Sequence, residues 1–416
     1  MSDNQFTFQH LETDQDIEEN LEIMRKVFGQ NTGVDLMVKK FLYNHPKMTF
    51  KSHFIIKHHG KTVATLNLIP LDWCIGDIPL KVAEMGNVAT LPEYRSRGLI
   101  RRLVQEYHKE VAQQGFDLSV IEGIPYFYRQ FGYEYALTHD EETTTSLEKL
   151  PEFNSKLEIR PFTIKDIPKA MKLLAQSQSK FCVHSVRDEQ IWKMQQETGL
   201  AGEYGFDGYA VEEKGEMTAY FRITCRLEEK ELILREATDA DYPTTMTVLS
   251  FLKNTGEKHG IETLIARTSY CDPTARILAT LGAERQVPPY AWQIRVTDYV
   301  SLLQKMKPLL ESRLAASEYR GLKEKLNLNF RQFRAQMAIE NGSVIDIHQL
   351  HTDEQCVIGL NPPASTRLIL GYKSREELET CFPDFSVRPR YKRLIDVLFP
   401  KLPSYIHVAY RVLQCT

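Results

Sequence analysis

VATLPEYRSRGLI, residues 88–100, joins an apolar strand to an amphipathic helix through a short basic loop. The strand ends in Val88, Ala89 and Thr90, and the helical stripe begins with Leu99 and Ile100. At the start of a helix, several backbone N–H groups lack intrahelical acceptors and lie at the positive end of the helix dipole. The stretch therefore predicts an anion-binding turn between a strand and a helix.

The residues of this loop fit a doubly charged ligand. Gly98 lets a ligand approach the backbone closely, and Arg95 and Arg97 add charge-assisted donors that suit a diphosphate. We expect the diphosphate to bind the backbone amides of Ser96, Arg97, Gly98, Leu99, Ile100 and Arg101. An amide-containing arm of the same ligand can hydrogen-bond the strand edge at 88–90. The alternative is a surface turn with solvated arginines, and the surrounding sequence decides between the two.

The spacing of apolar residues on both sides of the loop predicts a first α/β unit. Segments with helical spacing alternate with runs rich in Val, Ile, Thr and Phe, and turn signals stand at His59-Gly60 and Gly76-Asp77. The expected helices are 14–28, 34–43 and 99–115, and the expected strands are 53–57, 62–70, 81–91 and 116–121.

The order of elements begins again near residue 157. A helix at 248–260, a strand at 262–266 and a helix and turn at 274–282 mirror the segments 99–115, 117–121 and 126–132. A third unit has a helix at 299–315, strands at 326–333, 334–340 and 343–350 around the turn Asn341-Gly342, and helices after Ser374 and at 391–398. The sequence therefore predicts an α/β (α+β) chain of three units, at 1–155, 156–290 and 291–416.

Composition excludes several classes of function. The 416 residues carry a formal net charge of -3 and contain no long basic run, so nucleic acid is not an expected partner. No apolar run approaches the roughly 20 residues that span a bilayer, and the N-terminus has no secretory pattern, so we expect no membrane span and a cytoplasmic location. The cysteines form no Cys-x-x-Cys pair, and His348, His351 and Cys356 lack a second ligand pair, so we expect no metal.

A second motif follows the loop by roughly thirty residues. It reads Tyr126-Phe127-Tyr128-Arg129-Gln130-Phe131-Gly132-Tyr133-Glu134. Together, the loop and this segment resemble the GNAT acetyltransferase family. In that family a Q/R-x-x-G-x-G/A loop binds the pyrophosphate of coenzyme A, and a Tyr-x-x-x-Gly-Phe/Tyr segment follows the fifth strand beside the thioester. Arg95, Gly98, Tyr128 and Gly132 occupy the matching positions.

One departure from the family pattern narrows the resemblance to a single branch of the superfamily. Ile100 stands where most of the superfamily has Gly or Ala, and a bulky aliphatic residue there looks like the enhanced-intracellular-survival (Eis) branch. That branch is similar over the whole chain, with a GNAT domain, a degenerate GNAT domain and a C-terminal sterol-carrier-like domain. The stretch from Trp292 to Asp298 resembles the beginning of its third domain. The resemblance also implies a homo-oligomer, which in that branch is a hexamer.

The resemblance assigns catalytic roles. Tyr128 would be the general acid that protonates the departing CoA thiolate, with Tyr126 and Tyr133 close enough in sequence to be alternatives. The branch uses its terminal carboxylate as general base, which here is Thr416, although its chains typically end at an aromatic near the position of Tyr410. Glu84 and Glu122, on or beside the predicted strands, are the alternative bases.

Three functions remain open at this point. The first is transfer of acetyl from acetyl-CoA to a primary amine of a small molecule or peptide, the second is transfer of longer acyl chains, and the third is CoA or lipid binding without catalysis. The loop at 95–98 together with Tyr128 favours the first. Acidic residues at 236–241 replace the basic loop in the second unit, so we expect one catalytic site per chain, with the second unit walling the acceptor pocket.

Overall fold

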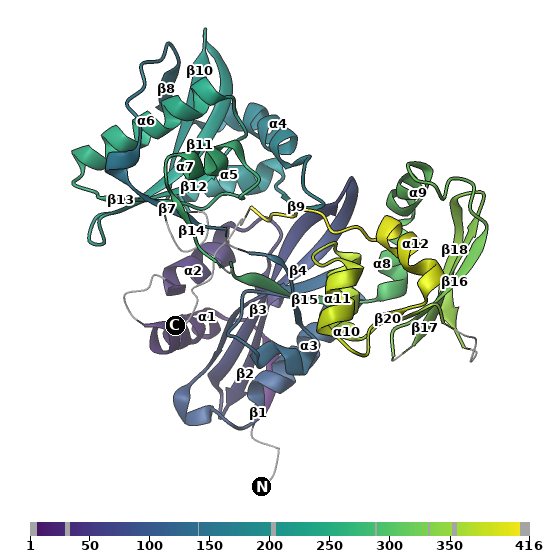
Figure 1. Cartoon of the computed structure of the whole chain (residues 1–416). Coiled ribbons are helices and arrows are strands. Elements are labelled where there is room, and N and C mark those ends of the chain that lie inside the picture. Colours follow the sequence, from purple (N-terminus) through teal and green to yellow (C-terminus); the bar gives the residue numbers. More distant parts are fainter. Residues whose placement is uncertain are drawn as a thin grey trace.

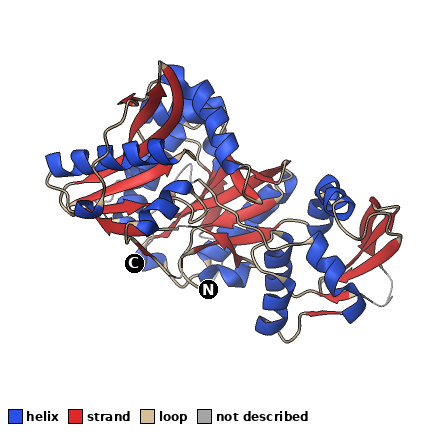
Figure 2. Cartoon of the chain, turned by 45° about the horizontal axis from the view of Figure 1, so that its top comes forward, coloured by secondary structure: helices blue, strands red, loops and turns tan. Residues whose placement is uncertain are grey.

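The computed structural model describes residues 6–29, 34–139, 141–200, 205–287, 289–331, 333–351 and 356–407. These residues form three β-sheets, each covered by helices, with the third sheet set to one side of the other two (Figures 1 and 2). The predicted mixed α/β class is therefore confirmed. No helix in the described ranges is both long and apolar enough to cross a bilayer.

The first sheet has the strand order β1-β2-β3-β4-β5-β15-β6, with β9 pairing to β3. Its strands are β1 (Phe6–His10), β2 (His53–His58), β3 (Lys61–Ile75), β4 (Ile78–Thr90), β5 (Leu118–Ile121), β6 (Glu134–Thr138), β9 (Val183–Val186) and β15 (Ala291–Val296). The sheet is flanked by α1 (Asp14–Phe28), α2 (Val34–Asn44) and α3 (Leu99–Gln113), which confirms the three predicted helices. β4 and β5 are parallel because α3 carries the chain back between them.

The second sheet repeats this connection, which confirms the predicted internal repeat. Its strands are β7 (Thr143–Ser146), β8 (Glu158–Pro161), β10 (Asp207–Glu213), β11 (Glu216–Arg226), β12 (Glu231–Ala237), β13 (Thr263–Ala266) and β14 (Glu284–Arg285). β12 and β13 are parallel and are joined by α6 (Tyr242–Lys258), as β4 and β5 are joined by α3. α6 begins before the predicted start at 248, because Asp241 caps it through the Thr244 amide at 3.0 Å. The remaining helices of this unit are α4 (Ile167–Gln178), α5 (Glu189–Thr198) and α7 (Pro273–Thr280).

Three strands pair across the predicted domain boundaries. β9 lies within 156–290 but pairs with β3 of the first sheet. β7 precedes residue 155 but lies in the second sheet between β14 and β13, and β15 follows residue 290 but lies in the first sheet between β5 and β6. The stretch predicted to begin the third domain, Trp292 to Asp298, therefore starts inside the first sheet. The ranges 1–155, 156–290 and 291–416 do not coincide with sheet membership, since the second unit is inserted between two strands of the first sheet.

The third unit has the sheet order β18-β17-β16-β19-β20. The strands are β16 (Glu324–Asn329), β17 (Arg334–Glu340), β18 (Ser343–Leu350), β19 (Ile358–Gly359) and β20 (Ser386–Val387), and the helices are α8 (Tyr299–Lys305), α9 (Lys307–Ala315), α10 (Pro362–Ile369), α11 (Arg375–Cys381) and α12 (Lys392–Leu398). The single helix predicted at 299–315 is wrong. It divides at Met306, because Pro308 lacks a backbone N–H and starts a new helix. The predicted turn at Asn341-Gly342 is confirmed, with φ of 52° and 78°.

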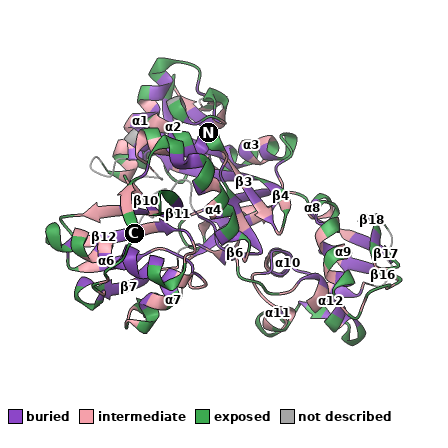
Figure 3. Cartoon of the chain, turned by 90° about the horizontal axis from the view of Figure 1, so that it is seen from above, coloured by how far each residue is buried: buried purple, intermediate pink, exposed green. Residues whose placement is uncertain are grey.

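After α12 the chain returns to the first two units as an extended segment that we call the tail (401–407), yellow in Figure 1. The tail runs beside β9: the Tyr405 amide donates to the Val183 carbonyl at 3.0 Å, and the Ser185 hydroxyl donates to the His407 carbonyl at 2.9 Å. Its last three described residues, Tyr405, Ile406 and His407, are buried. Figure 3 shows, in purple, the buried residues of the chain, many of which lie in the strands of the first sheet such as β3 and β6. The C-terminal unit thus reaches the junction of the other two.

Because β15 completes the first sheet, loss of its central side chain should destabilise the N-terminal unit. Trp292 is 1% exposed and packs edge-on against Trp73 with ring centroids 5.6 Å apart. Trp292→Ala should lower the free energy of unfolding by about 3–5 kcal/mol, as other buried Trp-to-Ala changes do. Urea denaturation is the measurement, and Val287→Ala, at a nearby side chain that is 78% exposed, is the control. Equal stability of the two variants would contradict the role of β15.

Candidate functional site

The parallel pairing between β4 and β5 ends early. Its register runs from Val82 opposite Leu118 to Glu84 opposite Val120, yet β4 continues to Thr90 while pairing with β3 alone. On the side facing β5, residues 85–90 of β4 have no strand partner within the described part of the chain. Backbone donors and acceptors on that edge are available to an extended ligand, as predicted for 88–90.

A β-bulge turns β4 away at this point. Asn87 and Val88 together face the single residue Leu66 of β3, and Asn87 has a φ of 51° in the left-handed region, which Asn tolerates. The Asn87 amide is buried, and neither of its polar atoms has a hydrogen-bond partner among the described residues. This bulge was not predicted from the sequence, although a glycine inside a strand pattern, here Gly86, is its usual signal.

The predicted anion turn follows directly. Gly98 is the N-cap of α3 with φ 77° and ψ 9°, no side chain caps the helix, and the first backbone bond runs from the Arg102 amide to the Gly98 carbonyl at 3.1 Å. The amides of residues 99–101 therefore lack helical acceptors. A Cβ at Gly98 would meet no atom within 4 Å, so the space in front of them is open.

The side chains around this turn divide into two sets. Arg95, Ser96 and Arg97 are exposed beside Gly98, and the Arg97 guanidinium stacks on Tyr94 at 5.4 Å. The second set consists of residues packed into the first unit, namely Val88, Ala89, Thr90, Leu99 and Ile100. Arg101 donates to the Gln130 side chain at 2.8 Å, which ties the start of α3 to the segment that carries Tyr128.

The equivalent turn of the second unit is closed. The Asp241 carboxylate accepts from the Thr244 amide at the start of α6, and Pro243 in the first turn has no N–H to offer. Asp239 pairs with Lys180 at 2.5 Å. Of the acidic residues at 236–241, Asp241 thus satisfies the helix end, while Asp239 and Glu236 pair with basic side chains.

Tyr128 lies where β5 ends. It is buried on the 3-10 helix η4 (Phe127–Phe131), and its ring packs flush on Gly123, where an added Cβ would overlap it. Among the alternative phenols, Tyr133 donates to or accepts from Ser119 at 2.6 Å and His108 at 3.1 Å, and Tyr126 is 70% exposed. Burial raises the pKa of Tyr133, so its phenol stays protonated within this network.

The buried carboxyl group of Glu84 lies on the opposite face of the first sheet from Tyr128. Ser119 faces α3, because it contacts Tyr107 of that helix at 3.0 Å, and Tyr128 packs edge-on against Tyr133 on the same side. Side chains alternate along a strand, so Glu84, which follows the residue paired with Ser119, points to the other face. β4 and β5 separate at one point in the sheet. Tyr128 and Glu84 therefore approach that point from opposite faces of the sheet.

Burial, and then the charge of Glu122, raise the pKa of Glu84 well above the usual carboxyl range. Glu122 itself contacts the buried His139, with Oε1 and Nε2 2.5 Å apart. Glu84 therefore favours its protonated form. Both carboxylates were candidates from the sequence, whereas His139 was not, because no local motif joins it to them.

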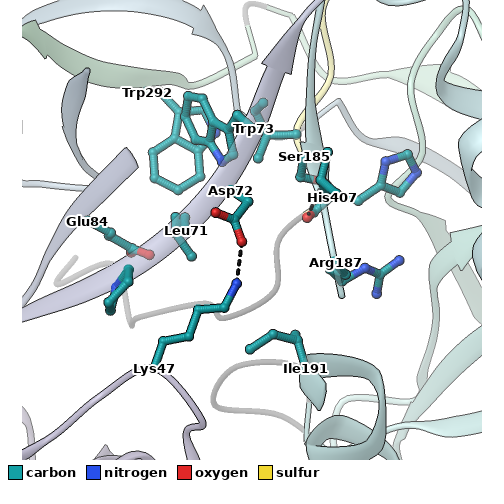
Figure 4. Close-up of a pocket in the computed structure, with 13 residues that line it drawn as sticks. Lys47, Leu71, Asp72, Trp73, Glu84, Ser185, Arg187, Ile191, Trp292 and His407 are labelled. Carbon is teal, nitrogen blue, oxygen red and sulfur yellow. Dashed lines mark hydrogen bonds and ion pairs between the residues drawn. The ribbon is translucent and has the colours of Figure 1, made fainter. Parts of the chain in front are cut away.

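The Glu84 side chain lines a cavity at the junction of the first two units and the tail (Figure 4). The lining residues are Lys47, Pro70, Leu71, Asp72, Trp73, Glu84, Ser185, Val186, Arg187, Ile191, Trp292, Ile406 and His407. Lys47 forms ion pairs with Asp72 and, at 2.7 Å, with Asp188. Apart from Glu84 and Trp292, these residues belong to no local motif, so the sequence did not single them out.

Two further predictions concern Thr416 and the candidate metal ligands. Thr416 lies outside the described residues, and the last described residue of the tail, His407, lines the cavity. Within the described part of the chain, no three His, Cys, Asp or Glu side chains gather as metal ligands, and His348 contacts Asp346 at 2.7 Å.

Comparisons with known proteins agree with this geometry. The sequence profile of the acetyltransferase (GNAT) domain matches residues 10–136, whereas a comparison with curated proteins finds no match. A GCN5-related N-acetyltransferase from Anabaena variabilis superposes with a TM-score of 0.74 at 16% identity, covering 97% of this chain and 99% of that one. One from Kribbella flavida gives 0.72 at 16% identity, covering 98% and 100%. Eis1 from Mycobacterium abscessus gives 0.64 at 13% identity, covering 97% and 99%.

The profile covers the bulged strand, the turn at Gly98 and Tyr128, and the structural likeness extends over all three sheets. The chain therefore contains a GNAT acetyltransferase domain at residues 10–136, which makes it an acyltransferase, and carries that domain in the overall fold of the Eis protein of Mycobacterium abscessus.

Proposed function

We propose that the chain transfers acetyl from acetyl-CoA to a primary amine by direct attack of the amine on the thioester. The observation that carries this proposal is the early end of the β4–β5 pairing. One side of that opening leads along the free edge at 85–90 to the uncapped turn at Gly98, and the other leads to the cavity lined by Glu84. The first side suits a long anionic donor, and the second suits a small acceptor.

In this proposal the amine nitrogen forms a bond to the thioester carbonyl carbon, the carbon–sulfur bond breaks, and the thiolate takes a proton. Tyr128 is the proposed donor of that proton, because its ring is held at the end of β5 by Gly123 and its two rival phenols are bound elsewhere or exposed. Diphosphate oxygens would accept from the amides of 96–101, with Arg95 and Arg97 beside them.

The proposed base has two candidates. The terminal carboxylate of Thr416 is implied by the Eis-like resemblance, and the tail that leads to it lines the cavity as far as His407. Glu84 is the alternative, since a carboxyl with a raised pKa is a stronger proton acceptor once ionised. The cytoplasmic location, the hexameric assembly and the sterol-carrier-like character of the third unit remain proposals from the resemblance.

Gly98→Asp should abolish acetyl-CoA binding, because a carboxylate would stand where the diphosphate binds. Gly115→Asp is a matched control, since Gly115 also has a positive φ, 68°, and open space around its Cα, at the other end of α3. Isothermal titration calorimetry with acetyl-CoA measures both variants. Equal affinity of the two would place the diphosphate elsewhere.

Tyr128→Phe should reduce kcat by about 10²–10⁴-fold and leave acetyl-CoA affinity nearly unchanged, because only the proton donor is removed. Tyr126→Phe removes an exposed phenol of the same segment and serves as the control. Steady-state release of the CoA thiol is the measurement. Unchanged kcat in Tyr128→Phe would assign the acid to another group.

The two candidate bases predict different outcomes. If the terminus acts, fusing a C-terminal tag should reduce kcat while acetyl-CoA binding and fold stay intact, and deletion of 411–416 should do the same unless the new terminus takes over. If Glu84 acts, Glu84→Gln should be the inactive variant, and wild-type kcat/KM should rise with pH through the raised pKa of Glu84, because the base works only when ionised. Full activity in both the tagged chain and Glu84→Gln would exclude both candidates.

A further inference from the structure

The cavity that holds Glu84 already contains a primary ammonium of the protein itself. Lys47 extends from the loop after α2, and Figure 4 shows its amino group directed at Asp72 of β3. Its second partner is Asp188, the N-cap of α5, at 2.7 Å. An acceptor amine enters a binding site as an ammonium, so this triad of Lys47, Asp72 and Asp188 bears directly on which amines fit.

One carboxylate oxygen of the triad has no hydrogen-bond partner among the described residues. Asp188 uses Oδ2 for Lys47 and Oδ1 to accept from the Ile191 amide at 2.9 Å. Asp72 uses Oδ2 for Lys47, and no described residue hydrogen-bonds its Oδ1, while its side chain is 44% exposed on the cavity wall. The triad carries two negative charges and one positive charge, so a single further cation neutralises it.

The other ionisable groups of the cavity are Glu84, Arg187 and His407. Glu84 is buried, points into the cavity without a described hydrogen-bond partner, and adds no charge while protonated. Burial lowers the pKa of His407 to about 4, so its ring is neutral at neutral pH. The Arg187 guanidinium is directed away from the Lys47–Asp72 pair (Figure 4) and donates to Glu236 at 2.7 Å and to Gln195 at 3.2 Å, and Glu236 also interacts with Arg222. The Arg187 charge therefore belongs to a cluster of two arginines and one carboxylate that lies away from the triad.

The rest of the lining is mostly apolar. Leu71, Trp73, Ile191, Trp292 and Ile406 face the same space. An apolar body would be desolvated here, whereas each further charge would need a partner that the wall lacks.

We propose that the acceptor is a small primary amine with one positive charge and an apolar body, whose ammonium binds Asp72 Oδ1 beside Lys47. This inference rests on the proposed acetyl transfer. Lys47 then acts as a specificity-determining residue, because it cancels one of the two carboxylates and so disfavours polycations. Removing its charge would leave two unpaired carboxylates and favour an acceptor with more than one ammonium.

The test compares three probe amines: phenethylamine (one charge, apolar body), phenylalanine (the same body with a carboxylate) and spermidine (a polycation). Wild type should have its highest kcat/KM with phenethylamine. Lys47→Met should shift the spermidine-to-phenethylamine ratio of kcat/KM about three- to tenfold toward spermidine. Lys47→Arg should keep the wild-type ratio, and so should Lys61→Met, which removes an exposed lysine at the start of β3.

Asp72→Asn should raise KM for phenethylamine and leave acetyl-CoA affinity unchanged. A ratio unmoved by Lys47→Met would overturn the proposal, as would phenylalanine being the best acceptor, since Arg187 would then be selecting a carboxylate. A binding measurement distinguishes a failure of this inference from a failure of the proposed function. If no amine is acetylated, the proposed function fails, and calorimetry of phenethylamine with wild type and Asp72→Asn still decides whether Asp72 holds an ammonium.

Discussion

The separation of β4 from β5 beyond Glu84 and Val120 is the constraint on which the site depends. In a continuous parallel sheet the backbone groups of both strands would bond to each other and leave none for a ligand. The bulge at Asn87 bends β4, and the same strand then passes through the loop into the uncapped start of α3. A free strand edge and a free helix end are thus made consecutive by one local irregularity.

The arrangement of the three sheets builds the second half of the site. β15 enters the first sheet after the chain has completed the second unit, and it places Trp292 in the wall of the cavity. β9 and the tail supply Ser185 and His407 to the facing wall. The proposed acceptor cavity therefore exists only when segments far apart in sequence are packed together, whereas the proposed donor turn lies within one stretch of chain.

This difference explains what the sequence could predict. The helix at 14–28, the turn at Gly98 and the repeat of the strand–helix–strand connection follow from local spacing, and the structure contains all three. The break of the helix at 299–315 was missed because apolar spacing continues through Pro308. Lys47, Asp72 and Asp188 carry no common motif, because their meeting depends on how α2, β3 and α5 pack. Glu84 was named from its strand, but its burial beside Glu122 is a tertiary effect.

The two repeats show what the open helix end costs. At the start of α6, Asp241 satisfies a backbone donor, and such a cap contributes about 0.5–2 kcal/mol to stability. The start of α3 has Gly98 at the same place and leaves its donors to solvent. Folding stability alone would favour the capped form in both units, since the change needs one short polar residue. The uncapped end fits the proposed binding of a ligand that supplies the missing acceptors, and the arginines at 95 and 97 suit an anion in that role.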